Sequence, residues 1–201
     1  MNKRKIVLSF SFFFIGALLF SQNADINILK QINLNRNKDL DPTFLFFTNS
    51  AVPISIASPV LIYSVGVIQK DSSVKAKGLY IGESIIVTAI ISTALKYGVN
   101  RTRPFITYPY IQKETDGGSP SFPSGHTSDA FATATSLSLA FPKWYVIAPS
   151  FLWAGIVGYS RMDLGVHYPS DVLAGAIIGA GSSFLCYKIN QRLAKRFNPA
   201  Q

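Results

Sequence analysis

Five apolar segments separated by polar loops make up most of the chain after residue 50. They run from Ala51 to Gln69, Leu79 to Leu95, Thr127 to Phe141, Trp144 to Tyr159 and Val172 to Tyr187. Such runs predict helices. Several are shorter than the ~20 residues that usually cross a bilayer, so a spanning bundle needs thin or tilted packing. We expect an all-α fold, a membrane-embedded bundle of five mature transmembrane helices, and keep a soluble bundle of very apolar helices as the alternative.

The first fifty residues have a different pattern. Residues 1–21 have a basic start, an apolar stretch from Ile6 to Phe20 and a small residue at Ser21, which predicts a signal peptide. The position two residues before Ser21 is not small, so an uncleaved signal anchor, giving six helices, stays open. Residues 22–50 are expected to form a polar periplasmic segment with a short amphipathic helix. Residues 51–201 then form the membrane domain.

Composition and charge favour a membrane protein. Of the 201 residues, 48% are apolar and 14% charged, a charged share well below that of soluble domains. The net charge of +9 lies largely in clusters near Lys3, Lys70 and Lys188, each beside an apolar segment. This placement fits topology signals better than a nucleic-acid-binding face, so no nucleic acid partner is expected. The single cysteine, Cys186, rules out an intrachain disulfide.

The positive-inside rule orients the predicted bundle. If the segment starting at Ala51 enters from outside, the clusters near Lys70, at Lys143 and at the C-terminus all fall inside. The loops from Lys96 to His126 and from Ser160 to Asp171 then fall outside. The first of these loops carries several cations against the rule, and these need a separate explanation.

Both histidines of the chain lie in these two loops, within three polar motifs. The first motif is Lys96, six residues, then Arg103-Pro104. The second motif, after 18 intervening residues, is Pro123-Ser124-Gly125-His126. The third motif follows after 33 intervening residues: it is Ser160-Arg161, five residues, His167, three residues and Asp171.

The residue types in these motifs predict a phosphate pocket. Lys96, Arg103 and Arg161 are costly to gather at a membrane boundary unless an anion joins them, and the planar fork of arginine suits phosphate oxygens. Ser124 and Gly125 precede a helix expected to begin near Thr127, so their backbone NH groups can point at a bound anion. Asp171, four positions after His167, is placed to face the imidazole and leave Nε2 free to attack phosphorus. A capped helix with solvated loop charges is the structural alternative.

Together the three motifs resemble the signature of the type-2 phosphatidic acid phosphatase (PAP2) superfamily, without a substitution. The resemblance covers Lys96 to Asp171. It implies that His167 is the nucleophile, Asp171 its partner and His126 the acid that protonates the leaving oxygen. Lys96, Arg103, Arg161, Ser124 and Gly125 would bind the phosphate.

The resemblance implies an enzyme that hydrolyses an amphiphilic phosphate in the bacterial inner membrane, with its active site facing the periplasm. Candidate substrates are phosphatidic acid, an isoprenyl diphosphate, phosphatidylglycerol phosphate and a lipid A phosphate. No metal or other cofactor is expected, and the oligomeric state stays open. Three other hypotheses are a secreted soluble acid phosphatase of the same superfamily, a vanadium haloperoxidase and a non-catalytic lipid-binding membrane protein.

Several further residues near the motifs have simpler interpretations. Arg101 is expected to be solvated or to face lipid headgroups, with contact to the substrate as the alternative. Glu83 is interpreted as a carboxylate at the membrane boundary, and Asp129 as a favourable charge in the first turn of its helix. Aromatic residues of the first outer loop either guide a lipid chain or anchor the loop at the interface; these are Phe105, Tyr108 and Tyr110.

Overall fold

The computed structural model describes residues 23–197, and within this range all regular secondary structure is helical. The expected signal segment at residues 1–21 lies outside the described residues. A helix over residues 23–34 is followed by the 3₁₀ helix η1 and by six α-helices: η1 (Lys38–Leu40), α2 (Asp41–Ile68), α3 (Ser72–Val99), α4 (Pro104–Thr107), α5 (Gly125–Ala140), α6 (Trp144–Asp163) and α7 (Pro169–Phe197). The predicted all-α bundle is confirmed.

Three of these helices have the length and apolarity needed to cross a membrane. The qualifying stretches are Lys38–Ile68, Ser72–Thr107 and Pro169–Leu193, which contain α2, α3 and most of α7. Many of their large apolar side chains are exposed, for example Leu61 at 63% and Ile90 at 63%. Exposed apolar surface on this scale suits lipid better than water, which supports the membrane-embedded bundle over the soluble one.

Helices α2, α3 and α7 are longer than the apolar segments that predicted them, whereas α5 is about as short as predicted. Helix α2 begins at Asp41 rather than at Ala51, so part of the segment expected to be polar loop continues the helix. Helix α5 has only 16 residues, about 24 Å at ~1.5 Å per residue. It packs against α2, α3, α6 and α7. Because its neighbours surround it, α5 is rich in small residues and carries buried hydroxyl groups such as Thr133 and Ser136.

Helices α5 and α7 approach each other closely, which glycine makes possible. A Cβ atom on Gly179 would lie 2.2 Å from the carbonyl oxygen of Ser128 and 2.8 Å from the backbone nitrogen of Ala132. One on Gly175 would lie 2.7 Å from the carbonyl oxygen of Ser124. Only a residue without a side chain fits at either position, and the contact fixes the start of α7 against the start of α5.

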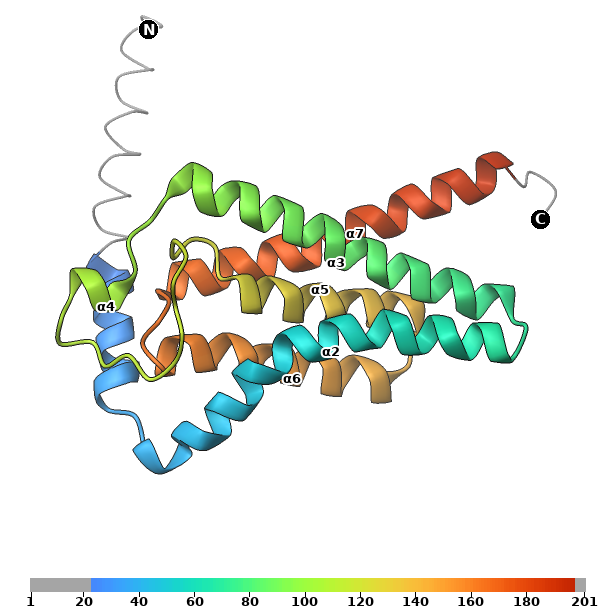
Figure 1. Cartoon of the computed structure of the whole chain (residues 1–201). Helices are drawn as coiled ribbons and strands as arrows, with labels where there is room; N and C mark the ends of the chain where they lie inside the picture. Colours follow the sequence, from blue (N-terminus) through green and yellow to red (C-terminus); the bar gives the residue numbers. More distant parts are fainter. Residues whose placement is uncertain (1–22, 198–201) are drawn as a thin grey trace, which may run out of the picture.

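The two ends of the bundle differ in content (Figure 1). One end holds the α2–α3 turn with Lys70, the α5–α6 turn with Lys143, and the end of α7. The other end holds the helix over residues 23–34, α4, the long loop between α3 and α5, and the loop between α6 and α7. The basic turns therefore lie at the end opposite the loops that carry the three motifs.

Candidate active site

All eight predicted site residues lie at the loop-rich end of the bundle, in four helices and in the loops beside them. Lys96 lies in the last turn of α3, and Arg103 directly precedes α4. The second motif lies at the start of α5, and the third motif joins the end of α6 to the start of α7. In chain order these residues are Lys96, Arg103, Ser124, Gly125, His126, Arg161, His167 and Asp171.

His167 and Asp171 form the buried centre of this region. The imidazole is 1% exposed and the carboxylate 0%. His167 Nδ1 lies 3.5 Å from Asp171 Oδ2, longer than a strong N–H···O hydrogen bond. The same carboxylate oxygen accepts hydrogen bonds from Ser121 Oγ at 2.5 Å and from the backbone NH of Tyr168 at 3.0 Å. On the other side of the ring, His167 Nε2 lies 3.4 Å from Arg103 Nη1, so Nε2 faces the cations.

Three cations surround this centre, held by neutral oxygen atoms. Arg103 donates to the carbonyl oxygens of Ser119 at 2.7 Å and Val166 at 2.9 Å. Lys96 Nζ donates to the carbonyl oxygens of Pro120 at 2.8 Å and Pro123 at 2.9 Å.

Arg161 is the most enclosed of the three cations, with 2% of its surface exposed. Its Nη1 donates to Thr48 Oγ1 at 2.5 Å and its Nη2 to the carbonyl oxygen of Asp116 at 3.2 Å. Its Nε is buried and has no hydrogen-bond partner within residues 23–197.

None of Lys96, Arg103 and Arg161 forms an ion pair within the part of the chain that the structure describes. Burying a charge without a counter-charge is costly. Three such cations at one end of the bundle therefore suit a bound anion that carries more than one negative charge.

The start of α5 provides one predicted anion contact and lacks another. The helix begins at Gly125, whose backbone NH belongs to the first turn and has no intrahelical acceptor. The backbone NH of Ser124, predicted to point at the anion, instead donates to the carbonyl oxygen of Asp171 at 3.0 Å. This occurs because α7 begins directly against the start of α5. The Ser124 hydroxyl is buried and accepts a hydrogen bond from Thr127 Oγ1 at 2.9 Å.

Both imidazoles are held in the neutral form. Burial lowers the pKa of His126 from 6.5 to about 4, and the nearby cations Arg161, Arg103 and Lys96 add to this effect. Burial also lowers the pKa of His167, to about 3, although the interaction of its Nδ1 with the Asp171 carboxylate acts in the opposite direction. A neutral His167 has a lone pair on one ring nitrogen, as a nucleophile requires. A neutral His126 has to gain a proton before it can act as an acid.

Arg101 is not solvated or turned to headgroups, so that prediction is wrong. Its Nη1 lies 2.6 Å from Asp171 Oδ1, and its Nη2 lies 2.7 Å from Asp25 Oδ2. The guanidinium also stacks over the Tyr168 ring, 3.8 Å from the ring centroid. The pairing with Asp171 draws Arg101 into the bundle end and gives the carboxylate its counter-charge.

Ser121 and Asp25 are site residues that sequence reasoning missed. Ser121 lies in the same loop as the second motif, but it belongs to none of the three motifs. Asp25 lies on the helix over residues 23–34, whose buried face includes Ile26, Leu29 and Asn33. Its carboxylate accepts hydrogen bonds from the backbone NH of Ser170 at 2.8 Å and from the Ser170 hydroxyl. The acidic residue on the buried face of an amphipathic helix was the one available signal.

The weaker candidates occupy structural positions. Asp129 lies in the second turn of α5 rather than the first. Glu83 is exposed and accepts a hydrogen bond from Asn190. Phe105 and Tyr108 pack against the apolar cluster under the helix over residues 23–34, and Tyr110 is 48% exposed. Among the described residues, no three His, Cys, Asp or Glu side chains gather as a metal site would require.

Comparison with known proteins agrees with this arrangement. Residues 77–195 match the family model of the PAP2 superfamily. The chain is 31% identical to an undecaprenyl-diphosphatase of Sulfolobus acidocaldarius over 92% of this chain and 86% of that protein. It is 38% identical to a lipid A 4'-phosphatase of Bacteroides thetaiotaomicron, over 48% of this chain and 43% of that protein.

A solved structure supports the same assignment. The crystal structure of Aquifex aeolicus LpxE superposes with a TM-score of 0.70 at 29% identity, covering 82% of this chain and 95% of that one. The family match covers more than half of the chain, and it includes every predicted site residue. The chain therefore belongs to the PAP2 superfamily, in its membrane lipid phosphatase branch, whose members hydrolyse phosphoric monoesters or diphosphates.

Proposed function

We propose that this protein hydrolyses an amphiphilic phosphate monoester or diphosphate at the periplasmic face of the inner membrane, through a covalent intermediate on His167. The observation that carries the proposal is the group of three cations beside a buried histidine, Lys96, Arg103 and Arg161, for which residues 23–197 provide no carboxylate partner. A phosphate bound among them would supply the missing negative charge.

The first chemical step follows from the position of His167. Its Nε2 faces Arg103, so it is directed toward a phosphate held by the cations. Nε2 attacks phosphorus, the bond from phosphorus to the leaving oxygen breaks, and the proton on Nδ1 is shared with Asp171. His126 in its protonated form gives a proton to the leaving oxygen. Lys96, Arg103, Arg161 and the NH of Gly125 stabilise charge on the remaining oxygens.

A second step regenerates the enzyme. His126, now neutral, takes a proton from a water molecule, whose oxygen attacks phosphorus. The bond between phosphorus and Nε2 then breaks, and inorganic phosphate leaves. The site lies within charged loops at one end of spans such as α3 and α7, so the reacting phosphate is placed at headgroup depth and the rest of the substrate faces the membrane.

The named functions of the relatives support two of the four candidate substrates. One relative is an undecaprenyl-diphosphatase and others are lipid A phosphatases, which favours an isoprenyl diphosphate and a lipid A phosphate; phosphatidic acid and phosphatidylglycerol phosphate stay candidates. The periplasmic orientation rests on the basic turns at the opposite end of the bundle, which the positive-inside rule places in the cytoplasm.

Phosphate release from these four lipid classes by purified protein tests the proposal. At least one lipid should be hydrolysed, with and without EDTA, and the His167→Ala variant should hydrolyse none. Release that disappears with EDTA and returns with a divalent ion would contradict the metal-independent mechanism. Full activity in the His167→Ala variant would contradict the assignment of the nucleophile.

A further inference from the structure

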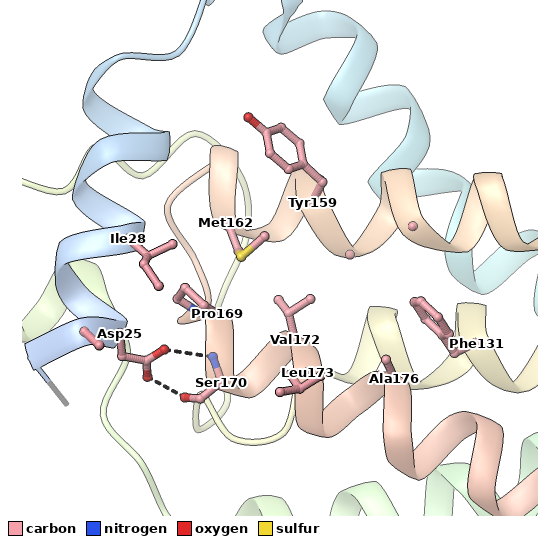
Figure 2. A pocket seen from close by; sticks show the side chains of 13 residues that line it. Asp25, Ile28, Phe131, Tyr159, Met162, Pro169, Ser170, Val172, Leu173 and Ala176 are labelled. Atoms are coloured by element: carbon pink, nitrogen blue, oxygen red, sulfur yellow. Dashed lines mark hydrogen bonds between the residues drawn. The ribbon is translucent and has the colours of Figure 1, made fainter. Parts of the chain in front are cut away.

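An apolar cavity lies between α6 and α7, at the end of the bundle that holds the active site (Figure 2). Its volume is about 590 Å³, within the ~300–1,000 Å³ of sites that bury small ligands. We call it the α6–α7 groove. Its walls combine residues of α6, α7 and the helix over residues 23–34 with one aromatic ring from α5, and they include Met162, Gly158, Gly155, Val172, Ile28 and Phe131.

One end of the groove is polar and touches the catalytic network. Asp25 and Ser170 line this end and are joined by hydrogen bonds, as Figure 2 shows. Asp25 also binds Arg101, which binds Asp171, and Ser170 immediately precedes Asp171 in the chain. The polar end of the groove therefore adjoins the hydrogen-bonded network that holds Asp171, the partner of His167.

The rest of the groove leads away from that end into the bundle. It follows α6 backward from Met162 to Gly155 and α7 forward from Pro169 to Ala176. Each path covers about two helical turns, or ~10 Å. Since α7 is one of the candidate spans, this direction leads from headgroup depth toward the membrane interior. A hydrocarbon chain attached to a phosphate at the active site would follow the same direction.

We propose that the α6–α7 groove binds a hydrocarbon chain of the substrate while its phosphate occupies the cation site. This inference rests on the proposed function and adds the place where the enzyme recognises the lipid part. Two features identify the occupant as a hydrocarbon chain of the substrate. The groove is continuous with the catalytic network at Ser170, and its remaining lining is apolar.

Gly155 offers a way to fill the groove. No atom lies within 4 Å of a Cβ built on Gly155, whereas a Cβ on Gly158 would meet Val172 at 3.2 Å. Gly155→Leu therefore adds a side chain to open space in the groove wall. Gly181 provides the matched control, because a Cβ there also has nothing within 4 Å and Gly181 does not line the groove.

The first experiment compares Gly155→Leu with Gly181→Leu on two substrates. For a long-chain phosphatidic acid, Gly155→Leu should lower kcat/KM about tenfold, as expected when a leucine displaces about two methylene groups of the chain. For p-nitrophenyl phosphate, which has no chain, it should leave kcat/KM unchanged, and Gly181→Leu should change neither. Unchanged hydrolysis of the long-chain substrate by Gly155→Leu would overturn the proposal.

A second experiment uses the unaltered protein and decides the matter if Gly155→Leu does not fold. A phosphatidic acid with a photoreactive group in its acyl chain should label residues 155–162 and 172–176, and excess unlabelled phosphatidic acid should suppress this labelling. Labelling elsewhere, or equal labelling by a diacylglycerol with the same photoreactive chain, would show that the groove does not select the substrate and would overturn the inference. Failure of the proposed function would appear separately, as no phosphate release by the unaltered protein.

Discussion

Replacing Asp25 by asparagine tests whether the helix over residues 23–34 supports catalysis from outside the three motifs. The Asp25 carboxylate lies 2.7 Å from Arg101 Nη2 and accepts a hydrogen bond from the Ser170 backbone NH at 2.8 Å. Asp25 thus holds Arg101, whose side chain pairs with Asp171, and Ser170, which precedes Asp171 in the chain. Its hydrogen bonds go to Arg101 and Ser170 and not to the three cations proposed to bind the phosphate.

The size of the effect follows from the bond that is lost. An asparagine at position 25 keeps an oxygen that can accept from the Ser170 NH, but it loses the charge-assisted bond to Arg101. Such bonds contribute about 1.5–3 kcal/mol. If about half of the upper figure is lost from the transition state, because Asp171 is held less firmly against His167, kcat falls about tenfold. The KM for p-nitrophenyl phosphate should stay unchanged, since Asp25 does not hold the phosphate and this substrate has no chain to enter the α6–α7 groove.

Steady-state kinetics of Asp25→Asn, with kcat expressed per vanadate-binding site, measures this directly. Counting binding sites removes the contribution of unfolded protein, which a purely structural role would affect. Asp39→Asn is the matched control, because it removes the same charge from an exposed carboxylate in η1. Unchanged kcat per site in Asp25→Asn, or an equal loss in Asp39→Asn, would refute the role given to Asp25.

Three further predictions concern the acid, the orientation and the packing. The pKa of His126 is about 4 because of burial and three cations, and a bound anion offsets those cations and raises the pKa. Vanadate binding near pH 6 should therefore be accompanied by uptake of a proton, measured calorimetrically in buffers of different ionisation enthalpy. The His126→Gln variant should bind vanadate without this uptake. In spheroplasts of a strain that expresses the protein, a cysteine at Gly118 should react with an impermeant thiol reagent and one at Ser73 should not; the reverse pattern would put the active site in the cytoplasm. Gly179→Ala forces a Cβ to within 2.2 Å of a carbonyl oxygen and should destabilise the protein by about 1–3 kcal/mol or more, seen as a lower melting temperature in detergent, whereas equal melting of Gly179→Ala and Gly181→Ala would contradict the close α5–α7 contact.

The sequence predicted the residues that carry their own chemical signal. Lys96, Arg103 and Arg161 are cations placed against the positive-inside rule, and His126 and His167 are the two histidines of the chain. These residue types have few roles at a membrane boundary, and the resemblance to the PAP2 signature assigned them to one site.

The partners of these residues could not be predicted, because they depend on tertiary contacts. Arg101 pairs with Asp171 across 70 positions of sequence, and Ser170 bonds to Asp25 across 145. No periodicity within a segment reports such a contact. The donor role predicted for the Ser124 backbone failed for the same reason, since that NH is taken by α7.

The helix bounds also could not be predicted fully from the pattern of apolar residues. The pattern located the cores of the spans but placed the start of α2 at Ala51, because polar residues interrupt the apolar run before it. A helix that leaves the membrane core still satisfies its own backbone hydrogen bonds, so it continues to Asp41 regardless of the side chains. The apolar pattern did predict a segment about as short as α5, but it could not show that four other helices surround it, because that is a tertiary contact.

The stereochemistry of phosphoryl transfer tests the proposed covalent intermediate most directly. Each in-line displacement at phosphorus inverts its configuration, and the mechanism contains two, at His167 and then at water. Hydrolysis of an isotopically chiral phosphorothioate ester in isotopically labelled water should therefore give thiophosphate with retained configuration. Inverted thiophosphate would mean that water attacks the substrate directly, and it would contradict a phosphohistidine at His167.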